Sequence, residues 1–157
     1  ATLSVENLQT IEPVLTHVFG YEQIGQEEHV HLFQVPGSKR AELLEVSEAP
    51  SLTRGFNAAG TVHHIAFRAK DEAEQQELRN KVLEIGLYPT QVINRYYFKS
   101  VYFRTRAGIL FEIATDQPGF TVNESEQDLG KKLDLPPFLE AERTVIEKNL
   151  PPITAHV

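Results

Sequence analysis

The chain has 157 residues, of which 41% are hydrophobic and 24% are charged, a composition typical of one globular domain or of two small units that share a core. A net charge of −7 and an isoelectric point of about 5.4 argue against a nucleic-acid partner, and no apolar run is long enough to cross a bilayer. The absence of cysteine excludes disulfides, thiolate metal sites and cysteine nucleophiles. We therefore expect a soluble, cytoplasmic protein.

The first fifty residues predict one strand, one helix and three further strands. Thr2 to Val5 alternates like a strand, and the next apolar residues recur at helical spacing before Gly20 ends the helix. Those helical residues are Leu8, Ile11, Val14, Leu15, Val18 and Phe19. Three strand-like runs follow, near Tyr21–Gln26, His29–Val35 and Ala41–Val46. We interpret residues 1–50 as one βαβββ unit.

The same order of elements recurs in residues 60–116. Val62–Ala69 predicts a strand, and Asp71–Ile85 predicts a helix. Three strand-like runs follow over Thr90–Arg95, Ser100–Arg104 and Ile109–Ala114. Self-similarity of this kind indicates a repeat architecture. The predicted fold class is therefore α+β, with two βαβββ repeats around a cleft.

Residues 117–157 have a different, more polar composition. A loop leads to a short predicted helix over Pro137–Asn149, in which Phe138 and Val145 are available for packing. We interpret this segment as a C-terminal extension, a loop and helix that pack on the repeats. It carries no chemistry that its sequence identifies.

Two side chains that can bind metal lie on predicted buried strands of the second repeat. Because neighbours on a strand point to opposite faces, His63 falls on the apolar face and His64 on the other. In the last strand Phe111 and Ile113 share the apolar face, which leaves Glu112 on the mixed one. A buried ionised carboxylate is costly unless it is paired or coordinated. His64 and Glu112 are therefore candidate ligands of a divalent metal ion in a cleft.

A structural role is the alternative for both residues. A histidine at the start of a strand is commonly a hydrogen-bonded structural residue, and a single strand glutamate is commonly solvated, so spacing alone favours that interpretation by roughly three to one. Aligning the repeats matches Thr2 with His64 and Glu45 with Glu112. The first repeat then has a carboxylate without an imidazole, and we expect Glu45 to be structural.

Paired βαβββ units with a strand-borne histidine and a last-strand glutamate resemble the vicinal-oxygen-chelate superfamily of glyoxalases, bleomycin resistance proteins and extradiol dioxygenases. The resemblance narrows to the C-terminal half of bacterial ring-cleaving dioxygenases of the hydroquinone type. It is carried by five segments: Gly60–Ala69, Asn94–Phe98, Ser100–Arg104, Gly108–Asp116 and Pro118–Phe120. The resemblance implies a glyoxalase-like open barrel or cleft.

The resemblance also implies a mononuclear Fe(II), or else Mn(II) or another divalent ion, held by two histidines and one glutamate. His64 and Glu112 match two of these metal ligands, and His63, Arg95 and Tyr102 match catalytic positions around them. Tyr102 and His63 would donate or shuttle protons, and Arg95 would stabilise developing negative charge. The implied substrates are O2 and a hydroquinone or catechol-like aromatic. Without the resemblance each of these three residues would be interpreted as structural.

The family's remaining histidine lies in an N-terminal pair of βαβββ units that this sequence lacks. The resemblance therefore implies that the chain is the C-terminal portion of such an enzyme and is inactive alone. The missing pair or a second chain, as in a homodimer, would complete the site.

Two other functions are open on the same fold. A glyoxalase-like isomerase or lyase would share its metal between chains, and it would need Glu45 in the cleft together with His29 or His31. We expect those two histidines to face solvent or a partner unit instead. A non-catalytic protein that binds a small aromatic molecule would need no metal.

Overall fold

The computed structural model describes residues 1–37, 43–51, 55 and 58–151. Residues 41 and 42 of the strand predicted over Ala41–Val46 lie outside this part of the chain. The chain divides into two compact units, Ala1–Gln117 and Pro118–Val157. In the part of the chain that the structure describes, no helix combines the length and apolar character that crossing a membrane requires.

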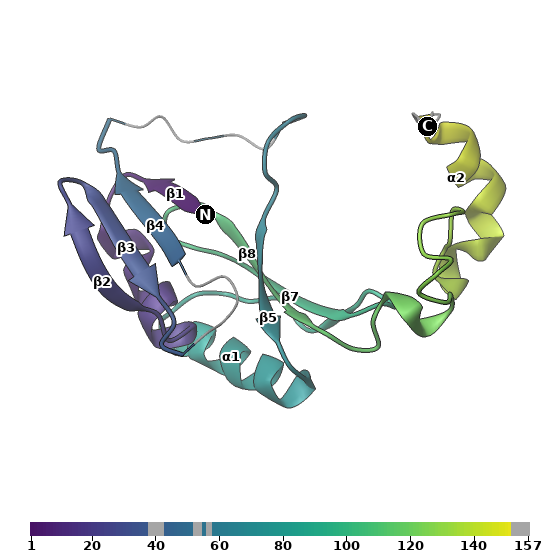
Figure 1. The fold of residues 1–157 in the computed structure, drawn as a ribbon, viewed down its shortest axis with the longest axis horizontal. Helices are drawn as coiled ribbons and strands as arrows, with labels where there is room; N and C mark the ends of the chain where they lie inside the picture. Colours follow the sequence, from purple (N-terminus) through teal and green to yellow (C-terminus); the bar gives the residue numbers. More distant parts are fainter. Residues whose placement is uncertain (38–42, 52–54, 56–57, 152–157) are drawn as a thin grey trace. The chain divides into compact units, whose positions relative to one another are not determined.

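The first repeat forms a sheet of four described strands in the order β1-β4-β3-β2 (Figure 1). The strands are β1 (Thr2–Val5), β2 (Glu22–Glu27), β3 (Val30–Gln34) and β4 (Leu43–Glu48). β1 runs parallel to β4, and the other pairs are antiparallel.

One continuous helix was predicted between β1 and β2, but the structure has two shorter segments. They are the 3-10 turn η1 (Leu8–Thr10) and the π-helical segment η2 (Val14–Val18). The break falls at Ile11, which ends η1 with φ of −125°, whereas Glu12 and Pro13 are already helical and lead into η2. Pro13 has no backbone N–H that could donate to η1, so a single helix cannot run through both segments. The prediction of a single helix was therefore wrong.

The second repeat repeats this topology as β5-β8-β7-β6, with β5 parallel to β8. The strands are β5 (Ile65–Ala69), β6 (Ile93–Asn94), β7 (Lys99–Arg104) and β8 (Leu110–Thr115). Helix α1 (Glu72–Glu84) begins after Asp71, whose side chain accepts a hydrogen bond from the backbone N–H of Glu74 at 2.9 Å. The chain leaves the helix through Gly86, which has a left-handed backbone with φ of 75°. The α+β fold of two βαβββ repeats is confirmed, and its sheets form no closed barrel among the described strands.

The strand pairing corrects the predicted alignment of the repeats by two residues. Thr2 lies opposite Glu45 in the first sheet, and Ala66 lies opposite Glu112 in the second. If the two glutamates are matched, Thr2 therefore corresponds to Ala66 and not to His64. A shift of two residues keeps every side chain on its face of the strand, so the hydrophobic pattern alone cannot detect it.

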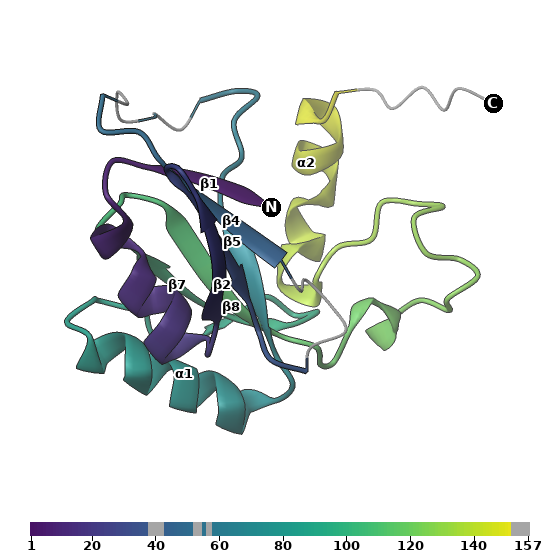
Figure 2. The ribbon, with the colours of Figure 1, turned by 60° about the vertical axis from the view of Figure 1, so that its left-hand side comes forward.

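One hydrophobic core joins the two repeats. η2 lies beside α1 (Figure 2), and Phe19 at the end of η2 stacks on Phe67 of β5 with 3.8 Å between ring centroids. Phe67 lies 4.9 Å from Phe111 of β8, which also meets Phe103 of β7 edge to face at 5.9 Å. Aromatic packing on the core face of β8 thus holds the strand that carries Glu112 in place.

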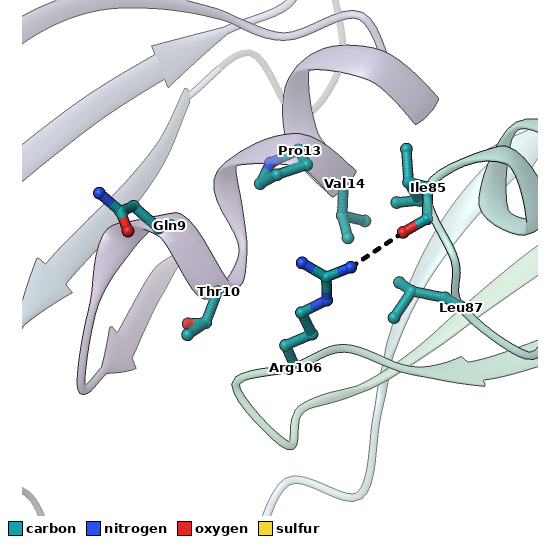
Figure 3. Close-up of a pocket in the computed structure, with 7 residues that line it drawn as sticks. All are labelled: Gln9, Thr10, Pro13, Val14, Ile85, Leu87 and Arg106. Atoms are coloured by element: carbon teal, nitrogen blue, oxygen red, sulfur yellow. Dashed lines mark hydrogen bonds between the residues drawn. The ribbon is translucent and has the colours of Figure 1, made fainter.

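The repeats also meet around Arg106, in the turn between β7 and β8 (Figure 3). Its guanidinium donates a hydrogen bond to the carbonyl of Ile85 at 3.2 Å and lies near Val14 and Leu87. The cavity there has a volume of about 10 Å³. That volume holds at most about one water molecule, so the contact is structural and not a ligand site.

The second unit contains η3 (Phe120–Val122), η4 (Pro137–Glu142) and α2 (Arg143–Asn149). The helix predicted over Pro137–Asn149 is therefore present, although η4 is a 3-10 helix. Arg143 links the two segments through ion pairs with Glu140 at 2.7 Å and Glu147 at 3.1 Å. The predicted packing of this extension on the repeats stays a prediction.

Candidate metal centre

His64 and Glu112 lie side by side although they are far apart in the sequence. His64 immediately precedes β5, and Glu112 lies on the neighbouring strand β8 opposite Ala66. The Nε2 atom of His64 is 2.7 Å from Oε2 of Glu112. Glu112 is only 3% exposed, whereas a third of the His64 side chain is accessible. A buried carboxylate therefore meets an imidazole that solvent and small molecules can reach.

Two hydroxyl groups hold the other oxygen of Glu112. Tyr102 lies opposite Glu112 on β7, and its hydroxyl donates to Oε1 at 2.9 Å. Ser100, two residues earlier on the same face of β7, also donates to Oε1. The ring of Tyr102 also lies perpendicular to that of His64, with 5.8 Å between the centroids. One carboxylate oxygen is thus occupied by hydroxyl donors while the other faces His64.

His63 and Arg95 lie next to these residues. Together the predicted site residues His63, His64, Arg95, Tyr102 and Glu112 form what we call the cluster. The Nδ1 atoms of His63 and His64 are 2.9 Å apart, so one ring donates a hydrogen bond to the other. His63 was predicted on the core face, but it is exposed, because β5 begins only at Ile65 and the strand alternation does not extend back to it. The guanidinium carbon of Arg95 lies 5.4 Å from the centre of the Tyr102 ring, in a cation–π contact. The structure thus brings together all five residues that the sequence predicted for the site.

Ser100 is the residue that sequence reasoning missed. A serine in a strand carries no metal or acid-base signal of its own. Its complete burial and its hydrogen bond to Glu112 emerge only when β7 pairs with β8.

His63 and His64 border a cleft of about 640 Å³ in the first unit, whereas Glu112, Tyr102 and Arg95 are not among the residues that line it. The cleft is lined by β1, by the residues before β5 and by the turn between β7 and β8, and it includes Leu3, His63, His64 and Leu110. Small-molecule sites in proteins have volumes of roughly 300–1,000 Å³. The cleft is therefore large enough for a substituted aromatic ring.

The donor geometry fits two ligands of a divalent ion. Neighbouring ligands of an octahedral ion, each about 2.1 Å from it, lie about 3 Å apart. His64 Nε2 and Glu112 Oε2 are 2.7 Å apart, so a separation of a few tenths of an ångström would admit the ion. Within the described ranges no group of three His, Asp or Glu side chains could hold a metal.

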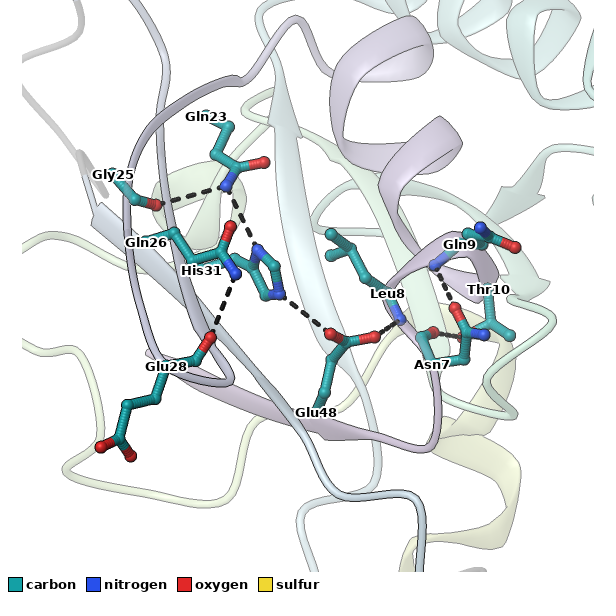
Figure 4. Close-up of polar contacts among 10 residues, drawn as sticks. All are labelled: Asn7, Leu8, Gln9, Thr10, Gln23, Gly25, Gln26, Glu28, His31 and Glu48. Atoms are coloured by element: carbon teal, nitrogen blue, oxygen red, sulfur yellow. Dashed lines mark hydrogen bonds and ion pairs between the residues drawn. The ribbon is translucent and has the colours of Figure 1, made fainter.

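The other histidines of interest lie in the first repeat, away from this cluster. His31 was predicted to face solvent or a partner, which is wrong: it is 5% exposed on the core face of β3 (Figure 4). Gln23 contacts its Nδ1 at 3.2 Å, and Glu48 contacts its Nε2 at 3.1 Å. Glu48 also accepts from the backbone N–H of Leu8 at 2.7 Å. Both ring nitrogens of His31 thus make contacts that connect β3 with β2 and with β4.

The remaining residues of the isomerase alternative also have local partners. Glu45 is exposed and accepts a hydrogen bond from Thr2 at 2.6 Å. His29 is exposed and lies 3.9 Å from Glu28. Among the described contacts Glu45 is therefore paired with neither His29 nor His31, as the isomerase alternative would need.

The contacts of Glu48 predict an acid-sensitive contribution to stability. The backbone N–H of Leu8 and then the ring of His31 hold the pKa of Glu48 below its usual value near 4.5. A carboxyl group with a lower pKa in the folded state stabilises the fold above its unfolded pKa, and this stabilisation is lost as the pH falls. We expect Glu48→Gln to be less stable than the wild type at pH 7, with a difference that narrows below about pH 4.5.

Urea unfolding of both proteins from pH 7 to pH 3.5 measures this difference. Glu22→Gln is the matched control, because it removes the same charge from an exposed position on β2. A stability difference for Glu48→Gln that stays constant over this pH range would contradict the prediction.

The fold and the cluster define a class of protein: two βαβββ repeats with an imidazole and a carboxylate converging beside a cleft. Residues 1–113 match the family model of the Glyoxalase/Bleomycin resistance protein/Dioxygenase superfamily. The chain belongs to this superfamily.

Individual relatives show which members of the superfamily the chain is similar to. MhqA of Bacillus subtilis (strain 168), a candidate ring-cleaving dioxygenase by its name, is 38% identical over 151 residues, which cover 89% of this chain and 46% of MhqA. A chlorohydroquinone/hydroquinone 1,2-dioxygenase of Sphingobium indicum is 40% identical over 82 residues, or 52% of this chain and 25% of that enzyme. A crystal structure of a candidate dioxygenase from Bacillus subtilis superposes with a TM-score of 0.91 at 37% identity, over 99% of this chain and 50% of that one. The chain thus spans about half the length of the relatives that it matches most fully.

Proposed function

We propose that this chain is the C-terminal portion of a ring-cleaving dioxygenase that uses Fe(II), or Mn(II) or another divalent ion, and O2 to open hydroquinone or catechol-like rings. The observation that supports it is the 2.7 Å approach of His64 Nε2 to Glu112 Oε2 beside a cleft. The names of the relatives, which include a hydroquinone dioxygenase, indicate the same reaction. His64 and Glu112 are the proposed metal ligands.

The bound ion would hold the aromatic substrate and O2 next to each other and carry electrons between them. Tyr102 keeps a proton on its phenol oxygen, 2.9 Å from Glu112 Oε1, and can donate that proton to a substrate oxygen held beside Glu112. His63 orients the ring of His64 through the Nδ1 contact and offers a second proton-transfer group. Arg95 places a positive charge over the Tyr102 ring, where it can stabilise negative charge on the substrate.

The third metal ligand would come from an N-terminal βαβββ pair or from a second copy of the chain in a homodimer. Two observations support this. The described residues contain no third side chain that could complete a metal site with His64 and Glu112, and relatives that match most of this chain, such as MhqA, are about twice as long. With two ligands the ion would be held mainly by water and bound weakly, so the isolated chain would be inactive. The C-terminal extension would pack on the repeats, and the enzyme would act in the cytoplasm.

Oxygen uptake is the direct test of this function. The full-length protein, which would supply the third ligand, is stripped of metal with a chelator, loaded anaerobically with Fe(II), and mixed with hydroquinone or catechol. We expect oxygen consumption matched by loss of the aromatic absorbance, with none in the chelated protein or the zinc-loaded control. Binding of an aromatic ligand that survives complete metal removal, without oxygen consumption, would favour a non-catalytic binder instead. Activity with zinc or nickel and no oxygen uptake would favour an isomerase.

A further inference from the structure

Ser100 is the most deeply buried polar side chain of the candidate metal centre. It is 0% exposed, and its hydroxyl donates to Oε1 of Glu112. A hydroxyl buried so completely is costly unless it is hydrogen-bonded, and Glu112 is its partner here. Because Ser100 is fully enclosed, it touches the carboxylate from the protein interior.

Ser100 and Tyr102 differ in what they can do for Glu112. Both hydroxyls donate to Oε1, which leaves Oε2 as the oxygen that faces His64. Tyr102 is partly exposed and lies beside the His64 ring, so its hydroxyl can turn toward a substrate. Ser100 cannot, because it is enclosed. When Tyr102 donates elsewhere, Ser100 is the donor that still holds Oε1.

The backbone around Ser100 and Glu112 is fixed from the opposite face of the sheet. Gln75 of α1 is 1% exposed, and its side-chain amide donates to the carbonyl of Lys99 at 2.8 Å and to that of Ile113 at 2.7 Å. These carbonyls belong to the residues next to Ser100 and Glu112. β7 and β8 are thus joined through α1 on one face and through the Ser100–Glu112 hydrogen bond on the other.

We propose that Ser100 is a positioning residue that orients Glu112 so that Oε2 alone binds the metal ion. This inference rests on the proposed function, because it assumes that Glu112 is a ligand. Without the Ser100 hydroxyl, Oε1 keeps only the partly exposed Tyr102 donor, and the carboxylate can rotate away from the ion. Partners that orient a metal ligand in this way change metal affinity by about 10–100-fold when they are removed.

Metal affinity, measured apart from activity, tests the inference. Mn(II) binding to the intact protein is followed through the EPR signal of the free ion, and the visible bands of bound Co(II) report ligand geometry. We expect Ser100→Ala to lower Mn(II) affinity about 10–100-fold and to shift the Co(II) bands, and Ser100→Thr to recover most of the affinity because it keeps the hydroxyl. Thr105→Val is the matched control, since it removes a buried hydroxyl that bonds the backbone N–H of Ile109 and not Glu112. Thermal unfolding verifies that every variant folds.

The outcomes separate this inference from the proposed function. A Ser100→Ala protein that is folded, binds Mn(II) within about twofold of the wild type and keeps its Co(II) bands would overturn the role of Ser100 alone. A wild type that binds neither ion would overturn the metal site. In that case crystal structures of the metal-free wild type and Ser100→Ala still decide the orienting role, which predicts a rotated Glu112 carboxylate in the variant and an unchanged one if Ser100 has no such role.

Discussion

Glu112→Gln is expected to reduce ring-cleaving activity of the Fe(II)-loaded protein by at least about a hundredfold, because removing even a partner of a metal ligand costs 10–100-fold. Glutamine has nearly the same size, and its amide oxygen can still accept from Ser100 and Tyr102. The substitution therefore removes the negative charge that faces His64 while the neighbouring hydroxyls keep a partner. Because Glu112 is buried, that charge is stabilised by few waters and depends on its protein and metal partners.

Glu45→Gln is the matched control for this substitution. Glu45 lies opposite β1 in the first sheet as Glu112 lies opposite β5 in the second, but it is exposed, and its carboxylate accepts a hydrogen bond from Thr2. We expect full oxygen uptake in Glu45→Gln and full folding in both variants by circular dichroism. If the Glu112→Gln protein kept more than about a third of the wild-type rate, Glu112 would not be a metal ligand.

Phe111→Ala is expected to destabilise the first unit by about 3–5 kcal/mol, which is the usual cost of deleting a buried phenylalanine. Phe111 is 0% exposed, and its ring contacts Phe67 and Phe103 from two other strands of the second sheet. It also lies 6.2 Å from Phe19 of the first repeat, so its loss leaves a cavity at the junction of both repeats. A loss of this size is a large fraction of the 5–15 kcal/mol that holds a typical domain folded.

Urea unfolding followed by circular dichroism measures this destabilisation. Tyr88→Ala is the control, since it removes an aromatic ring that is 91% exposed, and we expect a change within about 0.5 kcal/mol. Phe111→Leu keeps most of the buried volume and should cost less than Phe111→Ala. A Phe111→Ala protein destabilised by less than about 1 kcal/mol would show that the aromatic cluster does not hold the repeats together.

Most of the fold could be predicted because the strands and α1 carry strong local patterns. β5 and β8 follow the alternation of apolar and polar residues, and α1 is bounded by Asp71 and Gly86, which are ordinary start and stop signals of a helix. The segment around Pro13 was misjudged because its apolar spacing is helical, whereas proline breaks the hydrogen bonding that a single helix needs.

The candidate site was only partly predictable. His64 and Glu112 carry side chains that can bind metal, and this chemistry singled them out, although His64 lies just before β5 and not on a strand face. His31 also has an imidazole that could bind metal, but it lies on the core face of β3, where it contacts Gln23 and Glu48. Ser100 has no distinctive chemistry, and its role depends on the pairing of β7 with β8. Local sequence thus identifies reactive side chains but not the neighbours that orient them.

The parallel pairing of β5 with β8 also fixes when the metal centre can form during folding. These are the first and last strands of the second repeat, and α1, β6 and β7 lie between them in the chain. Contacts between segments so distant in sequence form slowly, because the intervening chain must be closed into a loop first. His64 therefore has no carboxylate neighbour until the whole repeat has been synthesised and β8 has docked. A nascent or truncated chain that ends before Leu110 would therefore lack the paired imidazole and carboxylate of the candidate site.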